Sequence, residues 1–267
     1  MKDFTSRLAR EDAVLVTVQS AQGSSPRDAG AWMGVFADGV AGTIGGGHLE
    51  FEAIARARRL LLEPGGEAIQ SFKLGPSLGQ CCGGVVHLRF ERVGAADVAA
   101  LQARLAPRRM PVALFGGGHV GKALVRTLAP LPFAIQWIDS RDEIFPGQLP
   151  DNVECEHSDP VHGAVGSLAP GSRVLIMSFS HAEDLDVVAA CLLRQREKAD
   201  LAFIGLIGSK TKWATFRRRL EQRGFTDSEL AQVTCPIGLA GIAGKEPEVI
   251  AVAVAAQLLQ LGAPGKP

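Results

Sequence analysis

The sequence predicts an α/β protein in which a smaller N-terminal α+β domain precedes a Rossmann-like domain with a parallel sheet. Three observations predict this fold. From residue 112 onward, short apolar runs alternate with helical patterns, as in a parallel sheet covered on both faces. The first of these runs ends in glycines that open a helix, which is typical of a phosphate-binding turn. Before residue 95, several β-like runs surround a single helical segment.

The smaller domain is predicted to occupy residues 1–94. After a polar start, its expected strands cover residues 13–18, 31–36, 40–44, 68–74 and 85–93. A helix is expected to follow the glycines at 45–47 and to end near residue 62, and residues 75–84 form a loop. Residues 95–111 are predicted to be a helix, over 97–105, followed by a linker with two prolines and two arginines.

The Rossmann-like domain is predicted to occupy residues 112–267, with a helical C-terminal extension. Expected strands begin at 112, 134, 153, 174 and 201, and a helix is expected over 182–196. The extension contains helices over 209–222, 227–232 and 247–261. A basic run at 210–219 is most simply a solvated helix face, with docking to an acidic patch as the alternative.

Composition limits the classes of partner. The 28 basic residues balance 28 acidic ones, so no overall field attracts nucleic acid or an acidic membrane. The longest apolar run, residues 249–261, is too short to span a bilayer, and no secretory segment is recognised at the start, so we expect a cytoplasmic protein. Five cysteines, an odd number, indicate a reducing compartment rather than a disulfide framework.

The glycine turn of the Rossmann-like domain is the first candidate site. Gly116, Gly118 and Gly121 have the spacing that allows a tight turn and close approach of a pyrophosphate. Asp139 ends the next expected strand eighteen residues beyond Gly121, near the ~20-residue distance at which an acid usually holds a ribose hydroxyl. His119 lies at the helix start, where it would meet an anion or, more commonly, cap or pack.

A second glycine turn, at Gly45, Gly46 and Gly47, precedes the helix of the smaller domain. With His48 beside it and Arg27 upstream, this turn could hold an anionic group of a cofactor. The alternative is a plain strand-to-helix turn whose helix start is complemented by two glutamates, at 50 and 52. Three consecutive glycines cost backbone entropy that a plain turn would not require, which favours a functional role.

Cys81 and Cys82 form an adjacent pair within a glycine-flanked loop. A thiolate there is a suitable ligand for a thiophilic metal, or an acceptor of persulfide sulfur. The alternative is burial as small apolar residues. Because adjacent residues entering a strand point to opposite faces, we expect at most one of them to serve the site.

Seven strings, in this order, resemble the xanthine dehydrogenase accessory family of the XdhC/CoxI type. They lie at residues 22–27 (QGSSPR), 42–50 (GTIGGGHLE), 79–84 (GQCCGG), 115–121 (FGGGHVG), 137–141 (WIDSR), 207–210 (IGSK) and 235–239 (CPIGL). The resemblance implies a cytoplasmic, dimeric chaperone that is not itself a catalyst. Such a protein binds molybdenum cofactor (molybdopterin), supports its sulfuration with a cysteine desulfurase, and delivers it to apo-xanthine dehydrogenase.

Two rival hypotheses remain. One is an NAD(P)-dependent oxidoreductase that uses the Rossmann-like domain, with Arg141 as a contact for a 2′-phosphate. The chain contains no tyrosine, which excludes a dehydrogenase whose acid is a Tyr-Lys pair. The other is a docking scaffold that binds the dehydrogenase but transfers no cofactor.

Overall fold

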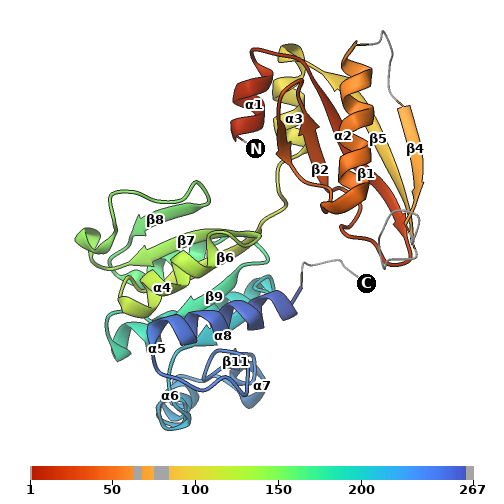
Figure 1. Ribbon diagram of the computed structural model, residues 1–267. Helices are drawn as coiled ribbons and strands as arrows, with labels where there is room; N and C mark the ends of the chain where they lie inside the picture. Colours follow the sequence, from red (N-terminus) through yellow and green to blue (C-terminus); the bar gives the residue numbers. More distant parts are fainter. Residues whose placement is uncertain (1, 63–67, 75–83, 263–267) are drawn as a thin grey trace. The chain divides into compact units, whose positions relative to one another are not determined.

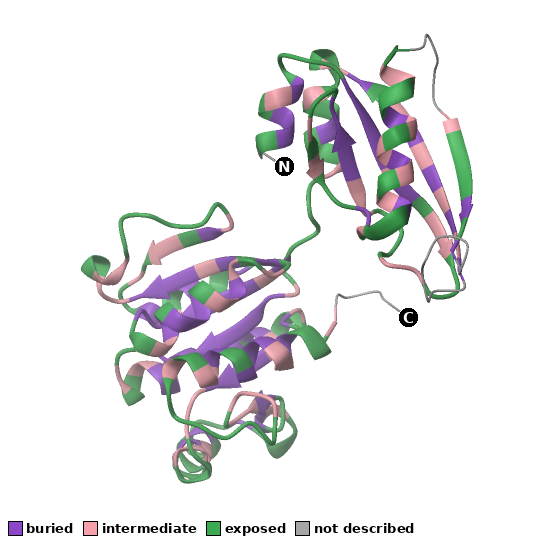
Figure 2. Cartoon of the chain, in the orientation of Figure 1, coloured by how far each residue is buried: buried purple, intermediate pink, exposed green. Residues whose placement is uncertain are grey.

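The computed structural model describes residues 2–62, 68–74 and 84–262 (Figure 1). The chain divides into two compact units, Met1–Ala106 and Pro107–Pro267, which we call the N-terminal unit and the Rossmann unit. In each unit, buried residues lie on the strands and on the helix faces that cover them (Figure 2). No helix within the described ranges is both long and apolar enough to cross a membrane.

The N-terminal unit is built on a five-stranded antiparallel sheet in the order β3-β2-β1-β5-β4. Its strands are β1 (Ala13–Gln22), β2 (Trp32–Val35), β3 (Val40–Gly42), β4 (Ala68–Lys73) and β5 (Val85–Val93). Helix α2 (Gly47–Leu62) covers one face, and α1 (Lys2–Leu8) and α3 (Val98–Arg104) contribute to the core on the other. Because successive residues of a strand point to opposite faces, Val14 and Val16 pack towards α2 while Ala13 and Leu15 pack towards α1 and α3.

Two features of this unit differ from the sequence prediction. Helix α1 was not predicted, because the only apolar residues it buries are Phe4 and Leu8, and two apolar residues four apart hardly stand out in a polar segment. The helix expected over 97–105 is a 3-10 turn, η2 (Ala95–Asp97), followed by α3.

The Rossmann unit contains a six-stranded parallel sheet in the order β11-β10-β9-β6-β7-β8. Its strands are β6 (Met110–Phe115), β7 (Phe133–Asp139), β8 (Val153–His157), β9 (Arg173–Ile176), β10 (Phe203–Leu206) and β11 (Val233–Thr234). The first strand lies in the middle, with the next two on one side and the last three on the other. This is the strand order of dinucleotide-binding Rossmann folds, and it creates a topological switch point between β6 and β9.

Helices cover both faces of the parallel sheet (Figure 1). Helices α4 (His119–Leu128) and α8 (Pro247–Gln260) pack on one face. The other face is covered by η4 (Val161–Ser167), α5 (His181–Lys198), α6 (Lys210–Gln222) and α7 (Asp227–Leu230). Along β6, Val112 and Leu114 face the first layer, and Ala113 and Phe115 face the second.

The fold class predicted from the sequence is confirmed. Strand β11 was not predicted, because two residues are too few to show the hydrophobic alternation of a strand. Its presence places α6 and α7 between two strands of the sheet, as a crossover connection. A 3-10 turn, η3 (Asp142–Ile144), follows β7 and reaches the glycine turn described next.

Candidate functional site

The glycine turn between β6 and α4 is shaped mainly by close packing. Gly116 has φ +124°, and a Cβ atom built on it would lie 2.0 Å from the carbonyl oxygen of Met177. A Cβ atom on Gly121 would lie 2.0 Å from the carbonyl oxygen of Gly116. That same oxygen accepts a hydrogen bond from Trp137 Nε1 at 2.9 Å. Both glycines are therefore required by the neighbouring backbone, whether or not a ligand binds.

The remaining glycine of the motif, Gly118, lies in a different environment. Gly118 is exposed and caps the N-terminus of α4, and a Cβ atom built on it would meet no other atom within 4 Å. His119 follows as an exposed residue at the first position of the helix. Of the residues predicted in this turn, these two are the ones that a ligand can approach from solvent. Their contact with a cofactor stays a prediction.

Asp139 ends β7 beside the glycine turn, and its carboxylate is fully hydrogen-bonded. It is 1% exposed. Its Oδ2 accepts from the Gly117 amide (2.6 Å) and from Arg141 Nη2 (3.0 Å), and its Oδ1 accepts from the Arg141 amide (2.9 Å) and Nε (2.8 Å). A carboxylate offers about four lone-pair positions. A ribose hydroxyl could be accepted only if one of these four bonds were broken.

The same contacts set the electrostatics of Asp139. Burial by itself would raise the pKa of this carboxyl, but the hydrogen bonds from Arg141 and Gly117 favour the charged form and hold the pKa below its usual value. Asp139 is thus an ionised group that ties the glycine turn to the loop after β7. Arg141, which the sequence suggested as a contact for a 2′-phosphate, instead donates hydrogen bonds to this carboxylate.

The second glycine turn, in the N-terminal unit, is hydrogen-bonded to a carboxylate of the protein itself. Gly45, Gly46 and Gly47 have φ values of +123°, +77° and +68°, a run of left-handed residues that accounts for the three glycines. The Glu50 carboxylate accepts hydrogen bonds from the amides of Ile44 and Gly46, both at 3.0 Å, and from the Thr43 hydroxyl at 2.5 Å. The position that an external anion would take on these amides is therefore occupied.

Glu50 is held in its charged form by this turn. Partial burial opposes ionisation, and the hydrogen bonds from Thr43 and from the backbone amides outweigh it, so the pKa lies below the ordinary glutamate value. His48 Nε2 lies 3.2 Å from the Glu52 carboxylate, one turn along the helix. The sequence indicated Glu50 only as one way of complementing the helix start, and the structure shows the specific contacts.

Arg27 lies against this second turn. A Cβ atom on Gly45 would be 2.4 Å from Pro26 Cβ and 3.2 Å from Arg27 Cγ, so the loop 23–31 packs directly on the turn. A cavity of about 410 Å³ opens along this loop, lined by Ser25, Pro26, Arg27, Asp28, Ala29 and Ala31. Within the described part of the chain, the Arg27 guanidinium has no hydrogen-bond or ion-pair partner. A free cation and a ligand-sized cavity thus occur together.

Cys81 and Cys82 lie outside the described residues. The described residues on either side are joined, because the Leu74 amide donates to the Gly84 carbonyl oxygen at 2.8 Å. A Cβ atom on Gly84 would lie 2.5 Å from the carbonyl oxygens of both Gln22 and Ser24. The structure therefore brings together the start of the Arg27 loop and the residue that follows the cysteine segment.

The other three cysteines are free thiols. Burial raises the pKa of each of them, and that of Cys191 to about 12. The residues the structure describes contain no group of three or more His, Cys, Asp or Glu side chains suited to a metal ion. Lys212, part of the predicted solvated basic face, is instead half-buried and forms an ion pair with the buried Asp184 at 2.7 Å.

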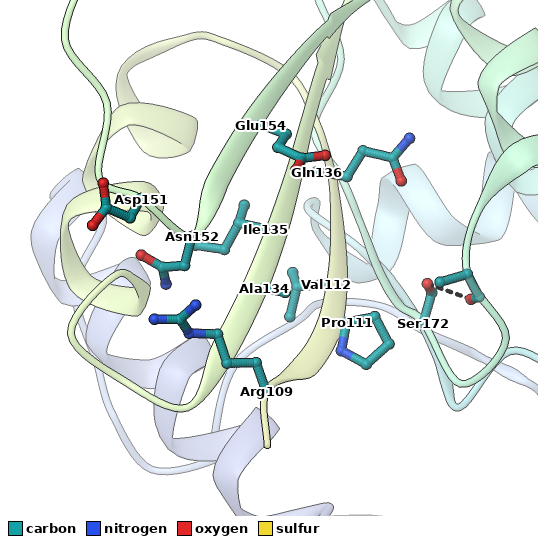
Figure 3. A pocket seen from close by; sticks show the side chains of 11 residues that line it. Arg109, Pro111, Val112, Ala134, Ile135, Gln136, Asp151, Asn152, Glu154 and Ser172 are labelled. Carbon is teal, nitrogen blue, oxygen red and sulfur yellow. Dashed lines mark hydrogen bonds between the residues drawn. The ribbon is translucent and has the colours of Figure 1, made fainter. Parts of the chain in front are cut away.

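A cavity of about 280 Å³ lies at the amino ends of strands β6 to β9 (Figure 3). Arg109, Asn152, Glu154 and Ser172 are among its lining residues. Ligands of open α/β sheets bind at the carboxyl ends of the strands. This cavity is at the opposite edge from the glycine turn, so it is not the candidate site.

Strand order, glycine turn and helix layers define a two-domain α/β protein in which an antiparallel α+β unit precedes a Rossmann-type unit in the sequence. The chain belongs to the XdhC and CoxI family. The XdhC Rossmann domain matches residues 112–258, and the XdhC and CoxI family domain matches residues 6–73. The family resemblance drawn from the sequence motifs is confirmed.

Two relatives illustrate the extent of the likeness. The uncharacterized protein YqeB of Escherichia coli (strain K12) is 30% identical over 261 residues, which cover 94% of this chain and 44% of YqeB. The chain thus spans less than half of that relative's length. A crystal structure described as a xanthine dehydrogenase from Bacillus halodurans superposes with a TM-score of 0.79 at 20% identity, covering 98% of this chain and 97% of that one. At this identity the second likeness shows the fold alone.

Proposed function

We propose that this protein is a maturation factor for xanthine dehydrogenase that binds molybdenum cofactor and is not itself a catalyst. In this role it would hold the cofactor while a cysteine desulfurase supports sulfuration, and then deliver it to apo-xanthine dehydrogenase. Membership of the XdhC and CoxI family supports the proposal. A homodimer would present two cofactor sites in one particle.

The observation that carries the proposal is the arrangement around Arg27. Arg27 is one of the residues that line a cavity of about 410 Å³, which is within the usual size range of small-molecule sites. The phosphate of the cofactor would be held by Arg27, which can bind a phosphate through two parallel hydrogen bonds. The Gly45 turn is a poorer anchor, because the Glu50 carboxylate already accepts from the amides of Ile44 and Gly46 and would repel a second anion.

The cysteine pair completes the proposed site. Cys82 precedes Gly84 by two residues in the sequence, and Gly84 packs on the carbonyl oxygens at the start of the Arg27 loop. A thiolate suits both functions that the proposal requires, since sulfur is a soft ligand and also accepts persulfide sulfur. When bound, the cofactor supplies the molybdenum centre that the client enzyme uses.

Molybdenum retention tests the proposal. Purified protein is incubated with molybdenum cofactor released from a denatured molybdoenzyme, desalted, and assayed for molybdenum and for activation of apo-xanthine dehydrogenase. We expect the unaltered protein to retain metal and to activate, and Arg27→Ala to lose most of both. Arg59→Ala, which removes an exposed arginine of α2, is the matched control and should behave like the unaltered protein.

The cysteine variants separate binding from sulfur transfer. If Cys81→Ala or Cys82→Ala retains molybdenum but fails to activate the dehydrogenase, that cysteine acts in sulfuration; loss of both indicates a ligand. Failure of the unaltered protein to retain molybdenum and to activate the enzyme would refute the proposed function. The NAD(P)-dependent alternative gains no specific support, because all lone pairs of Asp139 are used within the protein.

A further inference from the structure

Another cavity of the Rossmann unit, of about 250 Å³, lies between helix α4 and the loop 146–150 that leads to β8; we call it the α4 cavity. Val125 of α4 and Trp137 of β7 line it and are almost completely buried, whereas Leu149 on the loop is 36% exposed. The floor of the cavity is therefore apolar and its outer wall meets solvent. Because β7 and β8 lie on the side of β6 away from β9, the α4 cavity is separate from the switch point at which dinucleotides bind.

The loop that forms the outer wall is anchored at both ends. Before it, the ring of Phe145 packs edge-on against Trp137, with 5.4 Å between the ring centroids. After it, Asn152 Nδ2 donates to the carbonyl oxygens of Ala129 (3.0 Å) and Phe133 (2.8 Å). The loop itself begins and ends with a proline, whose ring fixes φ and limits the conformations of the wall. The cavity is therefore formed before a ligand enters it.

Among the described residues that line the α4 cavity, the two charged ones are both basic. They are Lys122 and Arg126, which are exposed and lie one turn apart on α4. Within the described ranges, the Lys122 ammonium has no hydrogen-bond or ion-pair partner. Arg126 lies 3.5 Å from the Glu248 carboxylate, but these side chains are 70% and 72% exposed, so the pair contributes little and can be exchanged for another anion.

The position of Lys122 in its helix also favours an anion at the cavity. Lys122 lies in the first turn of α4, and that turn contains no acidic residue. The positive end of the helix dipole disfavours a cation at this position. An anion bound between Lys122 and Arg126 would offset the repulsion.

We propose that the α4 cavity binds a small organic acid, with its apolar body on the floor formed by Val125 and Trp137 and its carboxylate at Lys122 and Arg126. A volume of about 250 Å³ is slightly below the usual range for drug-sized ligands, so the ligand is small. Its carboxylate forms charge-assisted hydrogen bonds with the two cations, and its apolar body removes the floor and Leu149 from water. This ligand belongs to a different class from the cofactor of the proposed function, and the inference does not rest on that function.

Calorimetric titration of the full chain tests the inference. The probes are octanoate and 2-naphthoate, an aliphatic and an aromatic acid, and octanamide and 2-naphthamide are their uncharged counterparts. We expect saturable binding of at least one acid, with a Kd below about 1 mM that rises with added salt. Lys122→Met should weaken this binding about 10-fold, the effect of losing one charge-assisted hydrogen bond. Lys122→Arg should retain it, because the positive charge is kept.

The chain offers a matched control variant. Lys210 is likewise an exposed lysine in the first turn of a helix of the same unit, α6, so Lys210→Met should bind the acid as the unaltered protein does. Leu149→Asp should abolish binding, because it places a negative charge on the cavity wall. Urea denaturation checks that the variants are folded. Lys122→Met should be at least as stable as the unaltered protein, because it removes a cation from a helix start.

The inference is overturned if neither acid binds with a Kd below about 1 mM, or if each amide binds as tightly as its acid. It is also overturned if Lys122→Met and Lys210→Met bind the acid equally well. If a second copy of the chain covers the cavity instead, Leu149→Asp changes the sedimentation coefficient and leaves acid binding unchanged, which also contradicts the inference. Molybdenum retention is measured separately, on variants of Arg27 in the other unit, so the two proposals can fail independently.

Discussion

Two glycines of one short turn should respond very differently to alanine. Gly116→Ala would place a Cβ atom 2.0 Å from the Met177 carbonyl oxygen, on a backbone with φ +124°. Gly118→Ala, two residues away, would meet no atom within 4 Å, on a backbone with φ −68° that alanine adopts readily. If a ligand alone required glycine in this turn, the two changes would cost the same in the free protein.

The expected magnitudes follow from these contacts. Overpacking costs about 1–3 kcal/mol, and a non-glycine residue in a sparsely populated backbone region costs about 1–3 kcal/mol more. Because the clash is with backbone, which cannot rotate away, we expect Gly116→Ala to lose about 4 kcal/mol of unfolding free energy. Gly118→Ala loses only the preference for glycine at a helix N-cap, roughly 0.5 kcal/mol.

Urea denaturation followed by tryptophan fluorescence measures the difference. The chain has three tryptophans, and in a Trp32→Phe background the remaining two, Trp137 and Trp213, report on the Rossmann unit. Trp137 is well suited, because it is 1% exposed and bonded to Gly116. A difference between the two variants below about 1 kcal/mol would refute the claim that packing alone requires glycine at 116.

Three further outcomes are expected. The pKa of Asp139 is lower in the folded than in the unfolded protein, so its contribution to the unfolding free energy is complete above the ordinary value of 3.8 and is lost as the pH falls through the folded pKa. Asp139→Asn should therefore reduce the fall of the unfolding free energy at acidic pH. An unchanged fall would contradict this. Cys191, with a pKa of about 12 and no exposed surface, should resist iodoacetamide at pH 8 until urea is added, which peptide mass spectrometry detects. Arg194→Ala should cost about 3 kcal/mol in urea denaturation, because the carbonyls of Val165 and Leu168 each lose a 2.7 Å hydrogen bond from this buried side chain; a loss below about 1 kcal/mol would show that water replaces it.

Much of the fold could be predicted from the sequence because the hydrophobic periodicity of helices and strands is a local property of the chain. The glycines after residue 115 and the alternation of strand and helix indicated a parallel sheet, and the strand over residues 85–93 was predicted with its observed bounds. Short or polar elements could not be predicted in the same way. Helix α1 and strand β11 form because distant residues bury them, and their own residues carry too few apolar positions to show a period.

The same distinction between local and tertiary information applies to the candidate site. The sequence determined which residues lie near each other along the chain: Gly116 with His119, Gly45 with His48, and the two adjacent cysteines. The tertiary structure decided what those residues are available to do. Asp139 meets Gly117 from 22 positions away, and this approach fills the lone pairs that a ribose would have needed.

Arg141 and Phe179 come from loops after different strands, and their contact exists only because the sheet places β6 between those strands. The packing of Arg27 on the Gly45 turn likewise depends on the folded structure, because the two segments are separated in the sequence. A residue type and its spacing determine which chemistry is available, because these are local properties of the chain. Whether a donor or acceptor is free depends on groups brought to it from elsewhere, and only the folded arrangement of the strands decides that.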